Sequence, residues 1–367
     1  MYLDMIQCLW TLFYNYLQFQ TNFIKVEVDM KSLSKRNHLM DAMKTIAALG
    51  VIFVHFPFPG VIGKICAAFG TVGVIFFFLI SGYQSYCDNP SESGKLLKRF
   101  KRNLNLVIAV LLVYVIYKVI EQIAMGGFSS WAQTYLLDPI TYIRMLVLGD
   151  FSFISCDPLW YLVAMLYGYL IIYLMEKYRL HKIFYIALPL LLLLRASMET
   201  YTNSFSHFSW FDWHFSGNFL VGALPMMLLG NYIRRNEEKI LEWGKKLFTP
   251  LAILSMALVF ITVNVKILEM DISQPFKMAA ATFFFMICLV LPLEKPVRVL
   301  GNIGRSLSLH IYVWHFLIGN LIKHLLTYLN ADLWVFDWFL PIATIVASIL
   351  LSLLLFKLES RKNTKNA

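Results

Sequence analysis

An aspartate, a lysine and a histidine share one predicted helix, and their spacing decides which chemistry they could do together. The stretch KTIAALGVIFVHF runs from Lys44 to Phe56, and ten uncharged residues separate Lys44 from His55. In a helix of about 3.6 residues per turn, Asp41, Lys44 and His55 lie on one face. At about 1.5 Å per residue, His55 is roughly 21 Å from Asp41 along the axis. The spacing predicts an acid–base pair at one end and, far from it, a side chain that exchanges protons near neutral pH.

This face belongs to an apolar segment, where a histidine is unfavourable. An ionisable side chain at the centre of a membrane helix costs about 2.5–3.5 kcal/mol on insertion scales, so such groups are kept mainly for function. A second interpretation stays open. Asp41 and Lys44 could be interfacial charges, and His55 could be a buried histidine that bonds to a neighbouring helix.

Composition predicts that the whole chain is built around such segments. Of its 367 residues, 59% are hydrophobic and 15% are charged. Apolar runs of about 20 residues, long enough to cross a bilayer core, recur along nearly the whole length. The sequence therefore predicts an all-α, polytopic membrane protein. Ten transmembrane spans are expected, near 40–58, 61–83, 103–124, 158–176, 182–198, 217–234, 248–267, 276–293, 306–328 and 335–356.

The basic residues predict the orientation of these spans. The formal net charge is +10, but lysine and arginine cluster in alternate loops, which is a topology signal rather than a nucleic-acid surface. Clusters occur, for example, in 95–102, 177–182 and 234–246. Because cytoplasmic loops carry the excess of basic residues, we expect both termini in the cytoplasm and no nucleic-acid partner.

The first thirty residues form a separate predicted segment. Polar residues recur there at spacings of three or four, which is typical of an amphipathic helix lying on the membrane. The stretch lacks the basic start and cleavage site of a signal peptide. Alternatively, translation begins at Met30 and the stretch is not native protein. The expected domains are this extension (1–30), a transmembrane domain (31–360) and a cytoplasmic tail (361–367).

Two predicted outward loops, 125–157 and 199–216, are longer than a connection needs. The second holds aromatic residues and histidines with no basic residue. Aromatic side chains at a membrane boundary usually form the interfacial belt; alternatively, they could be a stacking platform for a sugar. His207, Asp212 and His214 match no strong metal-ligand pattern, and neither do the five cysteines.

Two further spans carry polar residues in apolar surroundings. The second span ends with Ser81 and a glycine, which could serve helix packing alone. The following stretch KLLKRFKRN suits a phosphorylated ligand, although topology also explains its cations. The ninth span begins SLSLHIYVWHF, where Tyr312 and His315 are unfavourable unless they line a cavity or find partners.

Five motifs, in order along the chain, resemble those of the acyltransferase 3 family of membrane enzymes. NHLMDAMKTIAALGVIFVH is similar to the opening motif of that family, in which an Asp is followed by a basic residue and a His. FFFLISGY and KRFKRN resemble its Phe-rich Ser-Gly motif and its basic stretch. DPLWYLVAMLYGYL and SLSLHIYVWH resemble the start of a later helix and a Ser…Tyr…His helix. The resemblance extends from about residue 36 to 356 and includes ten spans.

The resemblance implies an enzyme of the cell membrane that moves an acyl group, often acetyl, from cytoplasmic acyl-CoA to a hydroxyl. The acceptor would be an envelope glycan or a lipid-linked sugar. The resemblance assigns His55 as catalytic base, supported by Asp41 and Lys44. Candidate donor-binding residues are Ser81, Arg99 and Arg102, and candidate cavity-lining residues are Trp160, Tyr312 and His315. Acyl-CoA would be a co-substrate, with no cofactor or metal expected.

The residue types suit that chemistry. A sugar hydroxyl is a poor nucleophile, so acyl transfer needs a base near pKa 7, which histidine supplies. The guanidinium groups of Arg99 and Arg102 suit CoA phosphates better than lysines do. The chain departs from the family pattern at Lys44, where many relatives have Arg, and at Asp157-Pro158, which replaces a polar residue, often His.

A transporter or flippase is the alternative function. In that case His55, His310 and His315 would form a proton or substrate path through the membrane. The absence of internal repeats and of matched broken spans in the sequence argues against it.

Overall fold

Every regular element in the described part of the chain is helical. The computed structural model describes residues 37–204, 218–268, 273–291, 293 and 297–365. The predicted N-terminal amphipathic helix lies outside these residues, and so do His207, Asp212 and His214.

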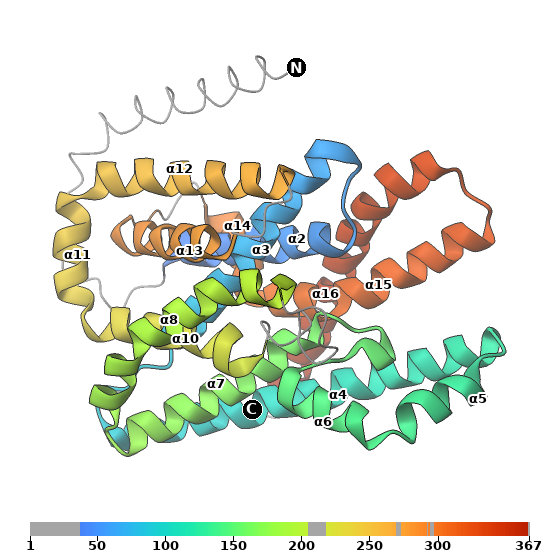
Figure 1. Ribbon diagram of the computed structural model, residues 1–367, viewed down its shortest axis with the longest axis horizontal. Coiled ribbons are helices and arrows are strands. Elements are labelled where there is room, and N and C mark those ends of the chain that lie inside the picture. The colour runs from blue at the N-terminus through green and yellow to red at the C-terminus, as the bar shows by residue number, and fades with distance from the viewer. Residues whose placement is uncertain (1–36, 205–217, 269–272, 292, 294–296, 366–367) are drawn as a thin grey trace, which may run out of the picture. The chain divides into compact units, whose positions relative to one another are not determined.

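Helices lie at all ten expected spans (Figure 1). They are α2 (His38–His55), α3 (Gly60–Tyr83), α4 (Gly94–Ala124), α7 (Leu159–Lys177), α8 (His181–Ser204), α10 (Leu224–Arg235), α12 (Phe248–Ile267), α13 (Ser273–Val290), α15 (Ser308–Tyr328) and α16 (Leu340–Lys365). Single π-helical turns, η5 (Phe219–Ala223) and η6 (Val335–Phe339), precede α10 and α16.

Short helices connect the long ones. They are η2 (Pro90–Ser93), α5 (Phe128–Trp131), the π-helical η3 (Ala132–Leu136), α6 (Pro139–Leu148), η4 (Ser152–Ile154), α11 (Glu237–Lys246) and α14 (Arg298–Ser306). Four of them, α5 to η4, fold up the long predicted loop 125–157.

The third span begins earlier than predicted. We expected it at 103, but α4 begins at Gly94, so the basic stretch is helical. Leucine, lysine and arginine have high helix propensity, and neither Pro nor Gly interrupts the helix after its first residue. Arg99 and Arg102 are therefore held on a helix rather than in a loop.

Seven of the described helices are long and apolar enough to cross a membrane. They include α2, α3, α4, α7, α8, α12 and the helix formed by η6 and α16. Of the other three expected spans, α10 has only 12 residues and the apolar part of α13 is shorter than the seven. α15 has 21 residues, but His310, His315 and other polar residues lower its hydropathy. The chain is thus an all-helical polytopic membrane protein, and one of its less apolar helices carries candidate site residues.

Small residues set the closest helix crossings. A Cβ atom added at Gly70 in α3 would lie 2.2 Å from the carbonyl oxygen of Gly50 in α2. One added at Gly82 would lie 1.8 Å from the carbonyl oxygen of Met227 in α10. Helices in lipid gain little from burying apolar surface against one another, so small residues that permit close contact stabilise their packing. Gly82 of the Ser-Gly motif is therefore required for packing.

Candidate functional site

Two histidines from opposite parts of the chain lie next to each other. His55 is the last residue of α2, and His315 is about two turns into α15. Their ring centroids are 5.5 Å apart, and the planes are inclined by 40°. The ring of Phe316 meets His55 edge-on at 5.0 Å. The first and ninth predicted spans thus bring their histidines together, and we call these two residues the histidine pair.

The two rings differ in their hydrogen bonding. His315 has no exposed surface, and its Nδ1 lies 2.7 Å from the carbonyl oxygen of Tyr312 and 3.2 Å from that of Ile311. A carbonyl oxygen only accepts, so a neutral His315 ring carries its proton on Nδ1. Its Nε2 is buried with no hydrogen-bond partner among the described residues. His55 is half-buried. The pair therefore combines a partly exposed histidine with a buried, unpartnered acceptor.

Aromatic side chains hold this pair in place. The hydroxyl of Tyr312 donates to the carbonyl oxygen of Pro158 at 2.9 Å, and its ring lies 5.9 Å from that of His315. Tyr161 packs against Tyr312 at 4.9 Å and against Trp160 at 6.3 Å. Of the predicted cavity-lining residues, Tyr312 is in direct contact with His315, whereas Trp160 is separated from Tyr312 by the ring of Tyr161.

Tyr161 was missed by the sequence prediction. It is buried between Trp160 and Tyr312 and packs on Phe78 at 4.6 Å. A signal for it was present, because it directly follows Trp160 in an apolar helix where a tyrosine hydroxyl is unfavourable without a partner.

At the other end of α2, the predicted acid and base form an ion pair. Lys44 Nζ donates to Asp41 Oδ1 at 3.0 Å, and only 16% and 11% of the two side chains are exposed. α14 covers this end of the helix. The hydroxyl of Thr45 donates to the carbonyl oxygen of Leu300 at 2.6 Å. Asp41 is thus about 21 Å from His55 along one unbroken helix.

The donor-binding candidates lie near that same end. α2 and α3 run antiparallel with Ala47 facing Gly73 and Gly50 facing Gly70, so Asp41 is level with the turn that precedes Ser81. The buried hydroxyl of Ser81 lies 3.5 Å from the sulfur of Met165.

The two arginine candidates differ in exposure. The guanidinium of Arg99 donates to the carbonyl oxygen of Gln84, just after the end of α3. Arg102, almost one turn further along α4, is exposed. α4 therefore places one arginine against the Ser81 end of α3 and leaves the other accessible.

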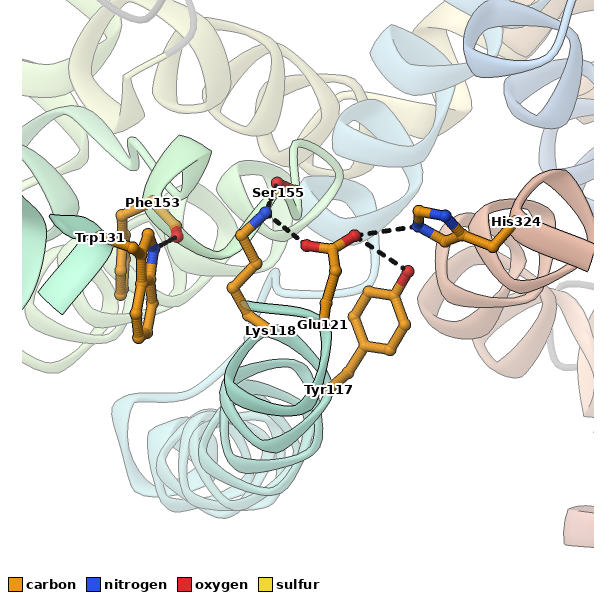
Figure 2. Close-up of polar contacts among 7 residues, drawn as sticks. All are labelled: Tyr117, Lys118, Glu121, Trp131, Phe153, Ser155 and His324. Carbon is orange, nitrogen blue, oxygen red and sulfur yellow. Dashed lines mark hydrogen bonds and ion pairs between the residues drawn. The ribbon is translucent and has the colours of Figure 1, made fainter. Parts of the chain in front are cut away.

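A charged network missed by the sequence prediction joins the far ends of α4 and α15 (Figure 2). Lys118 Nζ lies 2.5 Å from Glu121 Oε2 and donates to the hydroxyl of Ser155 at 2.9 Å. Glu121 Oε1 lies 2.9 Å from His324 Nε2 and accepts from Tyr117 at 3.5 Å. The Lys–Glu spacing of three inside an expected span was a signal for this network.

Among the described residues, no group of three His, Cys, Asp or Glu side chains could hold a metal ion. The carboxylates of Asp41 and Glu121 both lie next to basic side chains. The described site offers imidazole groups that can transfer a proton and guanidinium groups that can bind an anion.

Comparison with known proteins assigns the family. Neither curated proteins nor solved structures give a match. A family model described as an acyltransferase domain, that of acyltransferase family 3, matches residues 37–357. This match covers most of the chain and confirms the resemblance noted over residues 36–356. The chain therefore belongs to the acyltransferase 3 family of membrane acyltransferases.

Proposed function

We propose that this protein is an O-acyltransferase of the cell membrane that uses acyl-CoA, with acetyl as the transferred group. The acceptor is a hydroxyl of an envelope glycan or a lipid-linked sugar, and His55 is the general base. One observation carries the proposal. The half-buried ring of His55 lies 5.5 Å from a buried histidine whose Nε2 has no partner among the described residues.

Proton transfer is the task of the histidine pair. His55 takes the proton of the acceptor hydroxyl as its oxygen attacks the thioester carbonyl. The C–S bond then breaks, and the CoA thiolate leaves with the proton that His55 returns. His315 acts as a positioning residue, because its Nε2 can accept the second N–H of His55 and stabilise the protonated ring.

The donor approaches from the other end of α2. Arg102, exposed on α4, and Arg99 bind the phosphates of CoA on the cytoplasmic side, where guanidinium groups give bidentate contacts. The thioester then has to reach His55 across about 21 Å of helix α2. The long pantetheine arm of CoA suits this distance, and the apolar surroundings limit hydrolysis of the thioester.

The test is mass spectrometry of envelope glycans from cells that express the wild-type chain or His55→Ala. We expect O-acetylated glycan with the wild type and a loss of about 100-fold or more in the variant, because a general base contributes at least that factor. His310→Ala, on the same helix as His315, is the matched control and keeps the wild-type level. Undiminished acetylation in His55→Ala contradicts the role of His55. Solute uptake without acylation supports the transporter instead.

A further inference from the structure

A polar cavity lies beside the charged network at the far ends of α4 and α15. Its volume is about 430 Å³. Lys118 and Gln122 of α4 form one wall, and Ser130, Thr134 and Ser155 add hydroxyl groups. The mechanism proposed above uses none of these residues.

The walls of the cavity are fixed by hydrogen bonds between different elements. The indole N–H of Trp131 in α5 donates to the carbonyl oxygen of Phe153 at 2.8 Å (Figure 2). Lys118 ties α4 to the same loop through Ser155 at 2.9 Å. Glu121 ties α4 to α15 through His324 at 2.9 Å. The residues that line the cavity come from three separate stretches of the chain, in α4, in α5 and η3, and around η4, so the cavity is a built feature of the fold.

The lining suits a sugar ring. Sugar hydroxyls both donate and accept, and the cavity offers donors and acceptors in the amide of Gln122 and the hydroxyls of Ser130 and Thr134. Trp131, Tyr135 and Phe153 add apolar aromatic surface for the C–H face of the ring. Because Lys118 is paired with Glu121, the wall has little net charge, which favours a neutral ring over an anion.

The cavity lies close to the histidine pair along α4. The hydroxyl of Tyr114 in α4 donates to the carbonyl oxygen of Val313 at 3.2 Å and accepts from the backbone N–H of Leu317 at 3.0 Å. Val313 and Leu317 flank His315 in α15. Lys118 is one turn, about 6 Å, further along α4 than Tyr114.

The loop that forms the other wall also leads to the site. Three residues after Ser155, Pro158 accepts the hydrogen bond that holds Tyr312 beside His315. On the predicted orientation, α4 ends on the outer side, away from the arginines that bind the donor. The cavity thus lies about one helical turn beyond the level of the histidine pair, on the acceptor side.

We infer that this cavity binds one neutral pyranose ring of the acceptor glycan, next to the ring or unit that receives the acyl group. The inference rests on the proposed function, because it names the place where that acceptor binds. It predicts that blocking the cavity weakens acceptor binding and leaves donor binding unchanged.

The test is saturation-transfer NMR on the full chain in lipid nanodiscs, since the sugar headgroups of maltoside detergents would compete. The probes are methyl glycosides of glucose, galactose, mannose, N-acetylglucosamine and N-acetylmannosamine. Thr134→Trp fills the cavity from an exposed position, and Gln122→Leu removes an amide without filling it. Gln133→Trp is the matched control, because Gln133 is the exposed neighbour of Thr134 in η3 and does not line the cavity.

We expect at least one glycoside to bind the wild type, Gln133→Trp and His55→Ala alike. Binding to Thr134→Trp is expected to be about tenfold weaker, a loss of about 1.4 kcal/mol, and Gln122→Leu is expected to weaken it less. The inference is overturned if no glycoside binds the wild type or if Thr134→Trp binds as the wild type does. If glycoside binding behaves as expected but the wild type transfers no acyl group, the proposed function fails and the sugar site remains.

Discussion

The two ends of α2 differ in how their ionisable side chains are paired. At one end, Lys44 and Asp41 neutralise each other at 3.0 Å, and α14 covers them. At the other end, the histidine pair has no carboxylate hydrogen-bonded to either ring among the described residues, and Nε2 of His315 has no partner. Buried polar groups are normally satisfied, and a catalytic role is one explanation of an unsatisfied one. Nδ1 of His38, at the Asp41 end of α2, is also buried with no hydrogen-bond partner among the described residues, so the contrast between the ends is in the ion pair. We propose that the ion pair stabilises one end of the helix and that the histidine pair does the chemistry at the other.

After the loss of His55 itself, the largest effect is expected from His315→Phe. Phenylalanine fills the same space but removes Nε2, while the carbonyl groups of Ile311 and Tyr312 stay within the helix. We expect acyl transfer to fall about 10- to 100-fold, less than the loss of a general base itself would give. Initial rates with acetyl-CoA and purified envelope glycan measure this effect. If His315→Phe loses thermal stability instead and keeps its rate, His315 is a packing residue.

An intermediate effect is expected from Lys44→Met. The change leaves Asp41 buried beside an apolar side chain, and breaking a fully buried pair costs about 3–5 kcal/mol. Because both side chains keep some exposure, we expect about 2 kcal/mol here, seen as a lower unfolding temperature of the purified protein.

The double variant Asp41→Asn/Lys44→Met is the control for that prediction. It removes both charges, so we expect it to be more stable than Lys44→Met alone. Equal stability of the two variants would show that the ion pair does not hold this end of α2. A large loss of transfer rate at unchanged stability would place the pair in the chemistry, and the comparison between the two ends would fail.

The smallest effect is expected from Arg102→Ala. This arginine is exposed, so the change leaves stability unaltered and removes one contact to the donor phosphates. We expect the KM for acetyl-CoA to rise about threefold to tenfold, with the larger value at low salt, since exposed charge contacts are weak and screened. Lys101→Ala, the exposed neighbour, is the control. A fall in kcat at unchanged KM would argue against donor binding by Arg102.

Local spacing predicted much of this molecule. Apolar runs located the helices, and a spacing of three predicted that Asp41 and Lys44 could pair. The predicted start of α4 was wrong. Basic residues are expected in the loops between membrane spans, but the residues of this stretch favour a helix. Lys118 and Glu121 have the same spacing as Asp41 and Lys44, so their pairing could have been predicted in the same way.

Contacts between distant helices could not be predicted from spacing. Residues 55 and 315 meet because α2 and α15 pack together, and no periodicity within either helix encodes that contact. The missing partner of His315 Nε2 likewise depends on every neighbour in three dimensions. The cavity by Trp131 needs three separate segments to form, so its shape was not predictable from the sequence.

The central claim is that His55 removes the proton of the acceptor hydroxyl. The most direct measurement compares the wild type with His55→Ala in proteoliposomes, recording both the rate of acetyl transfer at saturating acetyl-CoA and the binding of acetyl-CoA. The account predicts a rate about 10²- to 10⁴-fold lower with donor binding unchanged. A variant rate within about threefold of the wild type would contradict it, since a general base contributes at least 10².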